Sequence, residues 1–142
     1  MSNMRGALNR DATRLGKPAP RAPYTILVAD DEPAMGPLAA DVLEPAGYVV
    51  LHTTDPREAI RLARQRPADI DLLLVDVKMP VMGGIELARR ILVLRPKMKV
   101  ILMSGNKRTG VNETDWPFLE KPFGIDTLTR MVASALGGPS PA

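Results

Sequence analysis

Short apolar runs alternate with helical patterns along most of this chain, and this alternation limits its fold more than any other feature. Five runs have the length and composition of buried strands, namely residues 25–29, 49–53, 72–76, 99–104 and 117–121. The third and fourth runs are apolar at successive positions, as expected for strands with helices over both faces. The pattern therefore predicts βαβ units in a doubly wound α/β fold with a parallel sheet.

Apolar residues at helical spacing predict four helices between and after these strands. Their apolar positions fall within residues 38–43, 59–63, 85–93 and 125–136. Asp55, which precedes a proline, is the predicted N-cap of the second helix. A proline is unfavourable inside a helix, so the first helix is predicted to begin between Met35 and Pro37. A glycine pair beginning at Gly137 predicts the end of the last helix.

The composition suits one globular domain and excludes several kinds of site. The 142 residues are 45% hydrophobic and 25% charged, with no Cys and with His52 as the only histidine. Disulfides and thiolate-bound metals are thereby excluded, and Ser-His-Asp catalysis is disfavoured. Apolar runs reach only about five residues, against roughly 18 for a membrane span. We therefore expect a cytoplasmic protein with no membrane contact.

Positive charge is concentrated near the N-terminus. Residues 1–23 hold five basic residues and one acidic residue, whereas the other 119 residues hold 14 basic and 15 acidic residues. The segment has no apolar periodicity, and we interpret it as a disordered, solvated tail without a signal peptide. The sequence thus predicts a basic tail over residues 1–23, one domain over 24–136 and a flexible tail over 137–142.

Chemically active side chains stand where four of the five predicted strands end. Asp30 and Asp31 follow the first strand, Asp76 ends the third, Ser104 ends the fourth and Lys121 ends the fifth. Ligands of doubly wound sheets bind at this edge. Clustered carboxylates repel one another unless a cation offsets them, and their oxygens suit Mg²⁺ or Mn²⁺. These residues predict a phosphoryl group held beside Mg²⁺, with Asp76 as the nucleophile. A helix-capping role for the first two acids is the alternative.

Four segments of the sequence resemble the receiver domain of two-component response regulators. They are VADDEP, LLLVDVKMPVMGG, VILMSGN and FLEKPF, in the family's order and nearly at its spacing. The resemblance covers residues 24–136. It implies a flavodoxin-like, five-stranded parallel sheet in the order 2-1-3-4-5 with helices on both faces.

The resemblance also implies roles for the acids. Asp76 matches the phospho-accepting aspartate, which receives its phosphoryl group from a phosphohistidine of a partner protein. Asp31 matches a direct Mg²⁺ ligand, and Asp30 matches an acid that usually holds the ion through water. Asp76 itself and the backbone carbonyl of Lys78 complete the implied metal-binding set.

The last two strands supply the implied anion-binding and switch residues. Ser104 matches the hydroxyl that bonds a phosphoryl oxygen, and Lys121 matches the ammonium that pairs with it. Phe118 matches the aromatic switch residue, which turns into the space that Ser104 leaves on phosphorylation. Pro122 matches the proline of a Lys-Pro bond that is usually cis in this family.

Three features depart from the family's usual pattern. Only 13 residues, 105–117, separate Ser104 from Phe118, so we expect the helix that usually connects the fourth and fifth strands to be reduced or absent. Lys78 stands two residues after the acceptor, where, with Asn106, it would influence how fast the phosphoryl group is hydrolysed. Phe118 has no hydroxyl, so its switching would depend on packing alone.

Other residues have plain structural interpretations. Met79 and Met82 are predicted to pack within the loop after the third strand, and Gly84 with the glycine before it to serve the entry to a helix. Trp116 is predicted to fill space beside the shortened connection, and His52 to be a solvated strand residue.

We therefore expect a phospho-accepting receiver of a two-component phosphorelay that acts through protein contact and is not an enzyme in the usual sense. Its partners would be a histidine kinase or a histidine phosphotransfer protein, and an unknown downstream protein. The chain would be a stand-alone receiver, or else a receiver cut from a hybrid histidine kinase or partnering with one. Homodimerisation is left open, and no DNA-binding domain is expected.

Two other functions are alternatives. A Mg²⁺-dependent phosphatase with an aspartyl-phosphate intermediate typically has a second acid two residues after its nucleophile, where this chain has Lys78. A receiver-like binding module that is never phosphorylated would not need the complete set of acids, hydroxyl and lysine.

Overall fold

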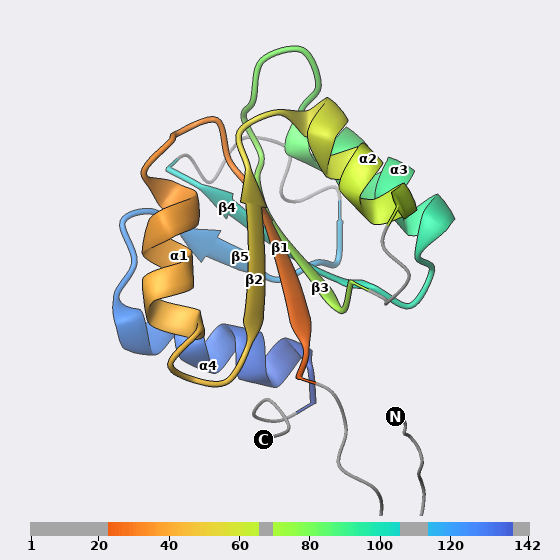
Figure 1. Cartoon of the computed structure of the whole chain (residues 1–142). Coiled ribbons are helices and arrows are strands. Elements are labelled where there is room, and N and C mark those ends of the chain that lie inside the picture. The colour runs from red at the N-terminus through yellow and green to blue at the C-terminus, as the bar shows by residue number, and fades with distance from the viewer. Residues whose placement is uncertain (1–22, 66–69, 106–113, 138–142) are drawn as a thin grey trace, which may run out of the picture.

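The computed structural model describes residues 23–65, 70–105 and 114–137 and contains a five-stranded parallel sheet with helices on both faces (Figure 1). The strands lie in the order β2-β1-β3-β4-β5, and every neighbouring pair is parallel. Their bounds are β1 Thr25–Ala29, β2 Val49–Thr53, β3 Leu72–Asp76, β4 Lys99–Ser104 and β5 Phe118–Glu120. The flavodoxin-like strand order expected from the sequence is thereby confirmed, with β5 shorter than predicted.

Four helices cover the sheet among the described residues, namely α1 Met35–Leu43, α2 Pro56–Gln65, α3 Gly84–Leu94 and α4 Ile125–Ala135. Helices α1 and α4 cover one face, and α2 and α3 cover the other (Figure 1). The first helix begins at Met35, within the predicted range. The Asp55 carboxylate accepts the Arg57 backbone N–H at 2.8 Å, which confirms the predicted N-cap of α2.

Several predictions concern residues that are not described. The predicted tails fall outside the described residues, except for their inner ends at residues 23 and 137. The connection between β4 and β5 covers residues 105–117, of which 106–113 are not described. Its described residues include no helix. None of the helices in the described part of the chain is long and apolar enough to cross a membrane.

The two central strands, β1 and β3, are buried along their whole length. Their side chains alternate between two apolar clusters, one under α2 and α3 and the other under α1 and α4. Leu27, for example, belongs to the first cluster and Val28 to the second. Burial on both faces explains why these strands are apolar at successive positions. Residues that directly follow such strands have a well-defined backbone position.

Helix α3 begins in close contact with the end of β3. Gly83 is its N-cap, and the Gly84 backbone N–H donates to the Val77 carbonyl at 2.9 Å. A Cβ atom on Gly84 would overlap the backbone carbonyl oxygen of Asp76. The predicted role of this glycine pair in the helix entry is therefore confirmed, and Gly84 permits the close approach.

We expect Gly84→Ala to lower the free energy of unfolding by about 1–3 kcal/mol, because the added methyl group must displace backbone at the end of β3. Gly105→Ala is the matched control, since a Cβ there would meet nothing within 4 Å. We expect it to change that free energy by less than about 0.5 kcal/mol. Urea denaturation of both variants tests this, and equal stability of the two would contradict it.

Candidate functional site

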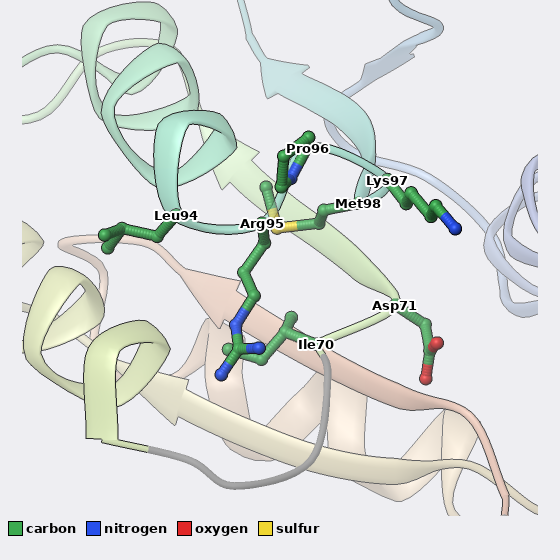
Figure 2. Close-up of a pocket in the computed structure, with 7 residues that line it drawn as sticks. All are labelled: Ile70, Asp71, Leu94, Arg95, Pro96, Lys97 and Met98. Carbon is green, nitrogen blue, oxygen red and sulfur yellow. The ribbon is translucent and has the colours of Figure 1, made fainter.

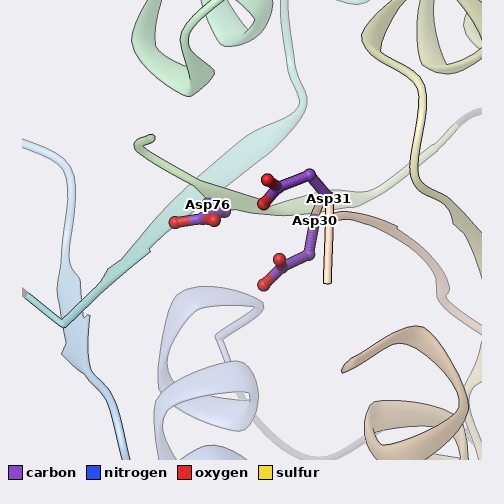
Figure 3. Close-up of side chains that lie close together, drawn as sticks. All are labelled: Asp30, Asp31 and Asp76. Carbon is purple, nitrogen blue, oxygen red and sulfur yellow. The ribbon is translucent and has the colours of Figure 1, made fainter. Parts of the chain in front are cut away.

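Three carboxylates meet where β1 and β3 end. Oxygen atoms of Asp30, Asp31 and Asp76 lie within 4.8 Å of one another. Figure 3 shows the carboxylates of Asp30 and Asp31 extending toward the side on which Asp76 lies. In the parallel register of these strands, Ala29 pairs with Val75, so the residues that follow reach the same level. The structure thus brings together the acids that the sequence placed on two separate strands.

The three acids differ in burial. Asp30 is 2% exposed and Asp76 is 7% exposed, whereas Asp31 is exposed. A carboxylate with so little access to water must be compensated by hydrogen bonds or by positive charge. Asp31 is open to solvent, so it is the acid best placed to meet an incoming ion.

Asp30 is held by groups from three separate parts of the chain. Its Oδ1 accepts the Glu32 backbone N–H at 2.9 Å, and its own N–H donates to the Thr53 carbonyl at 3.2 Å. The Lys121 ammonium lies 2.7 Å from its Oδ2. Thr53 ends β2, a strand for which the sequence suggested no part in the site. Its contribution is a backbone carbonyl, for which the sequence carries no signal.

Lys121 bridges two acids. Its Nζ, besides contacting Asp30, lies 3.6 Å from Asp76 Oδ2. Its backbone N–H donates to the Ser104 carbonyl at 2.9 Å, which ties the end of β5 to the end of β4. Ser104 is 3% exposed, and the Lys121–Pro122 bond is cis, as expected. The predicted hydroxyl and ammonium therefore reach the same sheet edge as the acids.

The electrostatics of the site leave Asp76 unusually basic. Burial, followed by the negative charge of Asp30, raises the pKa of Asp76 from 3.8 to about 6, although Lys121 opposes the shift. Burial alone would lower the pKa of Lys121, but its hydrogen bond to Asp30 and the charges of both acids outweigh burial and raise that pKa. Lys121 therefore stays charged near neutral pH and offsets part of the negative charge.

The donor set fits a hard divalent cation. All three side chains offer carboxylate oxygens, and the one ammonium only partly offsets their charge. Mg²⁺ prefers such oxygens and keeps several of its waters, which an exposed acid such as Asp31 allows. The carbonyl of Lys78 stays a predicted ligand. The backbone N–H of Lys78 donates to Asp76 Oδ1 at 3.3 Å.

The remaining predicted residues have defined places, with one exception. Phe118 and Trp116 are half-buried and pack against the apolar cluster under α2 and α3. Met79 and Met82 are buried in the same cluster, as predicted. His52 is exposed, also as predicted, and Asn106 lies outside the described residues.

A cavity of about 300 Å³ lies at the opposite edge of the sheet, where β3 and β4 begin (Figure 2). Two of its polar side chains form hydrogen bonds that stabilise the fold. The Arg95 Nε donates to the Ala63 carbonyl near the end of α2, at 3.2 Å. The Asp71 Oδ2 accepts the Thr25 backbone N–H at 2.8 Å. This cavity is therefore separate from the acidic cluster and shares no residue with it.

Comparison with known proteins agrees with the geometry. Residues 26–133 match the family described as "Response regulator receiver domain". "Response regulator receiver protein CpdR" of Brucella abortus (strain 2308) is 34% identical over 116 residues, which cover 78% of this chain and 95% of that protein. "Response regulator GtcR" of Aneurinibacillus migulanus is 33% identical over 117 residues, 77% of this chain and 46% of that protein. The chain thus spans nearly all of the first relative but less than half of the second.

A solved structure shows the same arrangement. The receiver domain from "Hybrid Histidine Kinase CckA" superposes with a TM-score of 0.69 at 36% identity. The match covers 79% of this chain and 98% of that one. The sequence match and the structural match each cover nearly four fifths of the chain.

The raised pKa of Asp76 predicts a specific pH dependence in metal-free protein. The folded state holds this proton up to a pH of about 6, whereas the unfolded state releases it near 3.8. The contribution of Asp76 to the free energy of unfolding is therefore fully present below pH 3.8 and is lost as pH rises through 6. We expect Asp76→Asn to gain stability relative to wild type over that interval.

Urea denaturation in EDTA at pH 4, 5, 6 and 7 measures this difference. Other titrating groups largely cancel between the two proteins, so the gap reports mainly on Asp76. A gap that does not change with pH would contradict the raised pKa.

Proposed function

The chain belongs to the response regulator receiver domain family, and from this membership we propose that Asp76 accepts a phosphoryl group in two-component signalling. One observation carries the proposal: the Asp76 carboxylate, whose pKa is raised, lies close both to the two acids that follow β1 and to the ammonium of Lys121. A candidate nucleophile, a candidate cation site and a group that can bind an anion thus lie together at one edge of the sheet. Their combination is what phosphoryl transfer to a carboxylate requires.

The proposed donor is a phosphohistidine on a histidine kinase or a histidine phosphotransfer protein. An Asp76 oxygen forms a bond to phosphorus while the phosphorus–nitrogen bond breaks, and the imidazole leaves with that electron pair. Mg²⁺, when bound by Asp30, Asp31 and Asp76, would neutralise charge on the phosphoryl oxygens. Similarity to the receiver domain of a hybrid histidine kinase supports a donor of this class.

Lys121 and Ser104 would hold the transferred group. The new phosphoryl group adds negative charge beside the Lys121 ammonium, which already lies 3.6 Å from Asp76 Oδ2. The Ser104 side chain, at the end of the neighbouring strand β4, would supply a hydroxyl donor. Both residues already lie at the edge of the sheet where Asp76 ends β3.

The proposed output is a change at β5. Movement of the Ser104 hydroxyl toward the phosphoryl group would leave space for the half-buried Phe118 ring, which starts β5. Phe118 and Trp116 pack against the same apolar cluster, under α2 and α3. Reorientation of Phe118 would therefore alter the surface near the start of β5, where a downstream protein would bind. The chain would act as an acceptor that is used once per transfer, and not as an enzyme in the usual sense.

Intact-mass spectrometry after incubation with acetyl phosphate tests the proposal. We expect one phosphoryl adduct on the wild type in Mg²⁺, and none in EDTA or on Asp76→Asn. Asp126→Asn, in the first turn of α4, removes an acid away from the cluster and should keep the adduct. A folded wild type without an adduct would favour the module that is never phosphorylated. Continuous release of inorganic phosphate from phosphate esters would favour the phosphatase.

Mg²⁺ should also stabilise the fold, because it binds the folded acidic cluster and not the unfolded chain. At ten times its Kd, a ligand of this kind adds about 1.4 kcal/mol to the free energy of unfolding. We expect most of that gain to disappear in Asp31→Asn and to persist in Glu32→Gln, an exposed neighbouring acid outside the cluster. Thermal denaturation with and without Mg²⁺ measures it. An equal gain in both variants would place the ion elsewhere.

A further inference from the structure

Thr53 is a polar residue buried at the end of an edge strand. In the described sheet, β2 has one neighbouring strand, β1, and Thr53 is the only residue of β2 that is buried. Its exposed fraction is 7%. The backbone of an edge strand lacks hydrogen bonds from a second strand, so its position on the outer side depends on other contacts. The Thr53 side chain makes such contacts.

The Thr53 hydroxyl joins the end of β2 to the start of α2. It donates to Glu58 Oε1 and accepts the Asp55 backbone N–H at 3.0 Å. Glu58 lies in the first turn of α2, and its other carboxylate oxygen accepts from Arg61 at 3.1 Å. A hydrogen bond to a charged carboxylate is stronger than one between neutral groups. This buried hydroxyl therefore both donates and accepts, and it fixes the turn between β2 and α2.

The backbone carbonyl of the same residue holds Asp30. It accepts the Asp30 backbone N–H at 3.2 Å, directly after the position where Ala29 pairs with Thr53. The Glu32 N–H and the Lys121 ammonium bond to the Asp30 carboxylate, whereas the Thr53 carbonyl fixes the main chain from which that carboxylate extends. Mg²⁺ tolerates little deviation from octahedral geometry, so a small displacement of an acid weakens its binding.

We propose that Thr53 is a positioning residue for the cation site, and that its hydroxyl sets the affinity for Mg²⁺ through Asp30. Loss of the hydroxyl separates the end of β2 from the first turn of α2 and leaves its outer side less firmly held. The Thr53 carbonyl then shifts, and Asp30 shifts with it. Groups that orient metal ligands through hydrogen bonds influence affinity in this way. This inference rests on the proposed function, because it assumes that the three acids bind Mg²⁺.

Two substitutions at Thr53 separate the hydroxyl from the shape of the side chain. Thr53→Val removes the hydroxyl and keeps the branched shape, whereas Thr53→Ser keeps the hydroxyl. Thr25→Val is the matched control, because Thr25 is 5% exposed and starts β1, at the end of that strand away from Asp30. Titration with Mg²⁺, followed by backbone amide chemical shifts, gives the Kd of each protein. Urea denaturation in EDTA gives the free energy of unfolding separately.

A second pair of variants tests the same link from the surface, where the core is left intact. Glu58→Ala removes the carboxylate to which the Thr53 hydroxyl donates. Glu86→Ala is its control, because Glu86 lies in the first turn of α3 and pairs with Arg90 as Glu58 pairs with Arg61. Both substitutions remove one negative charge and one exposed ion pair, but of these two acids only Glu58 bonds to Thr53.

We expect Thr53→Val to raise the Kd for Mg²⁺ about fivefold or more, and Glu58→Ala to raise it about threefold. Thr53→Ser and both controls should stay within about twofold of wild type, whatever their stability in EDTA. A folded Thr53→Val protein that binds Mg²⁺ like wild type would overturn the inference, as would equal losses in the valine and serine variants. If Thr53→Val does not fold, equal effects of Glu58→Ala and Glu86→Ala would overturn it. A wild type that binds no Mg²⁺ would instead overturn the proposed function.

Discussion

Lys121 joins three strands at one edge of the sheet, with its Nζ 2.7 Å from Asp30 Oδ2 and 3.6 Å from Asp76 Oδ2. Without this ammonium, two carboxylates with almost no access to water would face each other in a poorly polarisable environment, where repulsion between like charges is strong. The pairing spans 91 residues of sequence, so it forms only once β5 has joined β4. A strand of three residues is therefore as necessary to the site as the two central strands.

The central strands make this arrangement possible because they are rigid. Every residue of β1 and β3 is buried, and each strand has hydrogen-bonded neighbours on both sides. Asp30 follows the first strand, and Asp76 ends the second. The free energy that holds these acids close together thus comes from apolar packing several residues away, and not from favourable contacts among the acids themselves. In each strand, the apolar residues stabilise the fold, and the acid at the end belongs to the candidate site.

The parts of this structure that could be predicted from sequence are those that depend on local patterns. Continuous apolar runs predicted the central strands, and the residues at their ends predicted which side chains meet. The hydrogen bond from the Asp30 backbone N–H to the Thr53 carbonyl could not be predicted. Nearly every residue offers a backbone carbonyl, and which one Asp30 meets depends on the β1–β2 register. The positive φ of Val81 was equally hidden, since the usual signal, a glycine or asparagine, is absent at that position.

Burial of charge and repulsion between carboxylates, both of which destabilise the fold, occur at the edge of the sheet where the acids lie. Burial and the charge of Asp30 raise the pKa of Asp76, so its ionised form lowers the stability of the fold near neutral pH. That same repulsion would be relieved by a divalent cation, and a more basic carboxylate is also a stronger nucleophile. With a pKa of about 6, Asp76 is still largely ionised at pH 7. An interaction that weakens the fold therefore makes this carboxylate more basic while it stays largely ionised at pH 7, provided that the central strands keep Asp30 beside it.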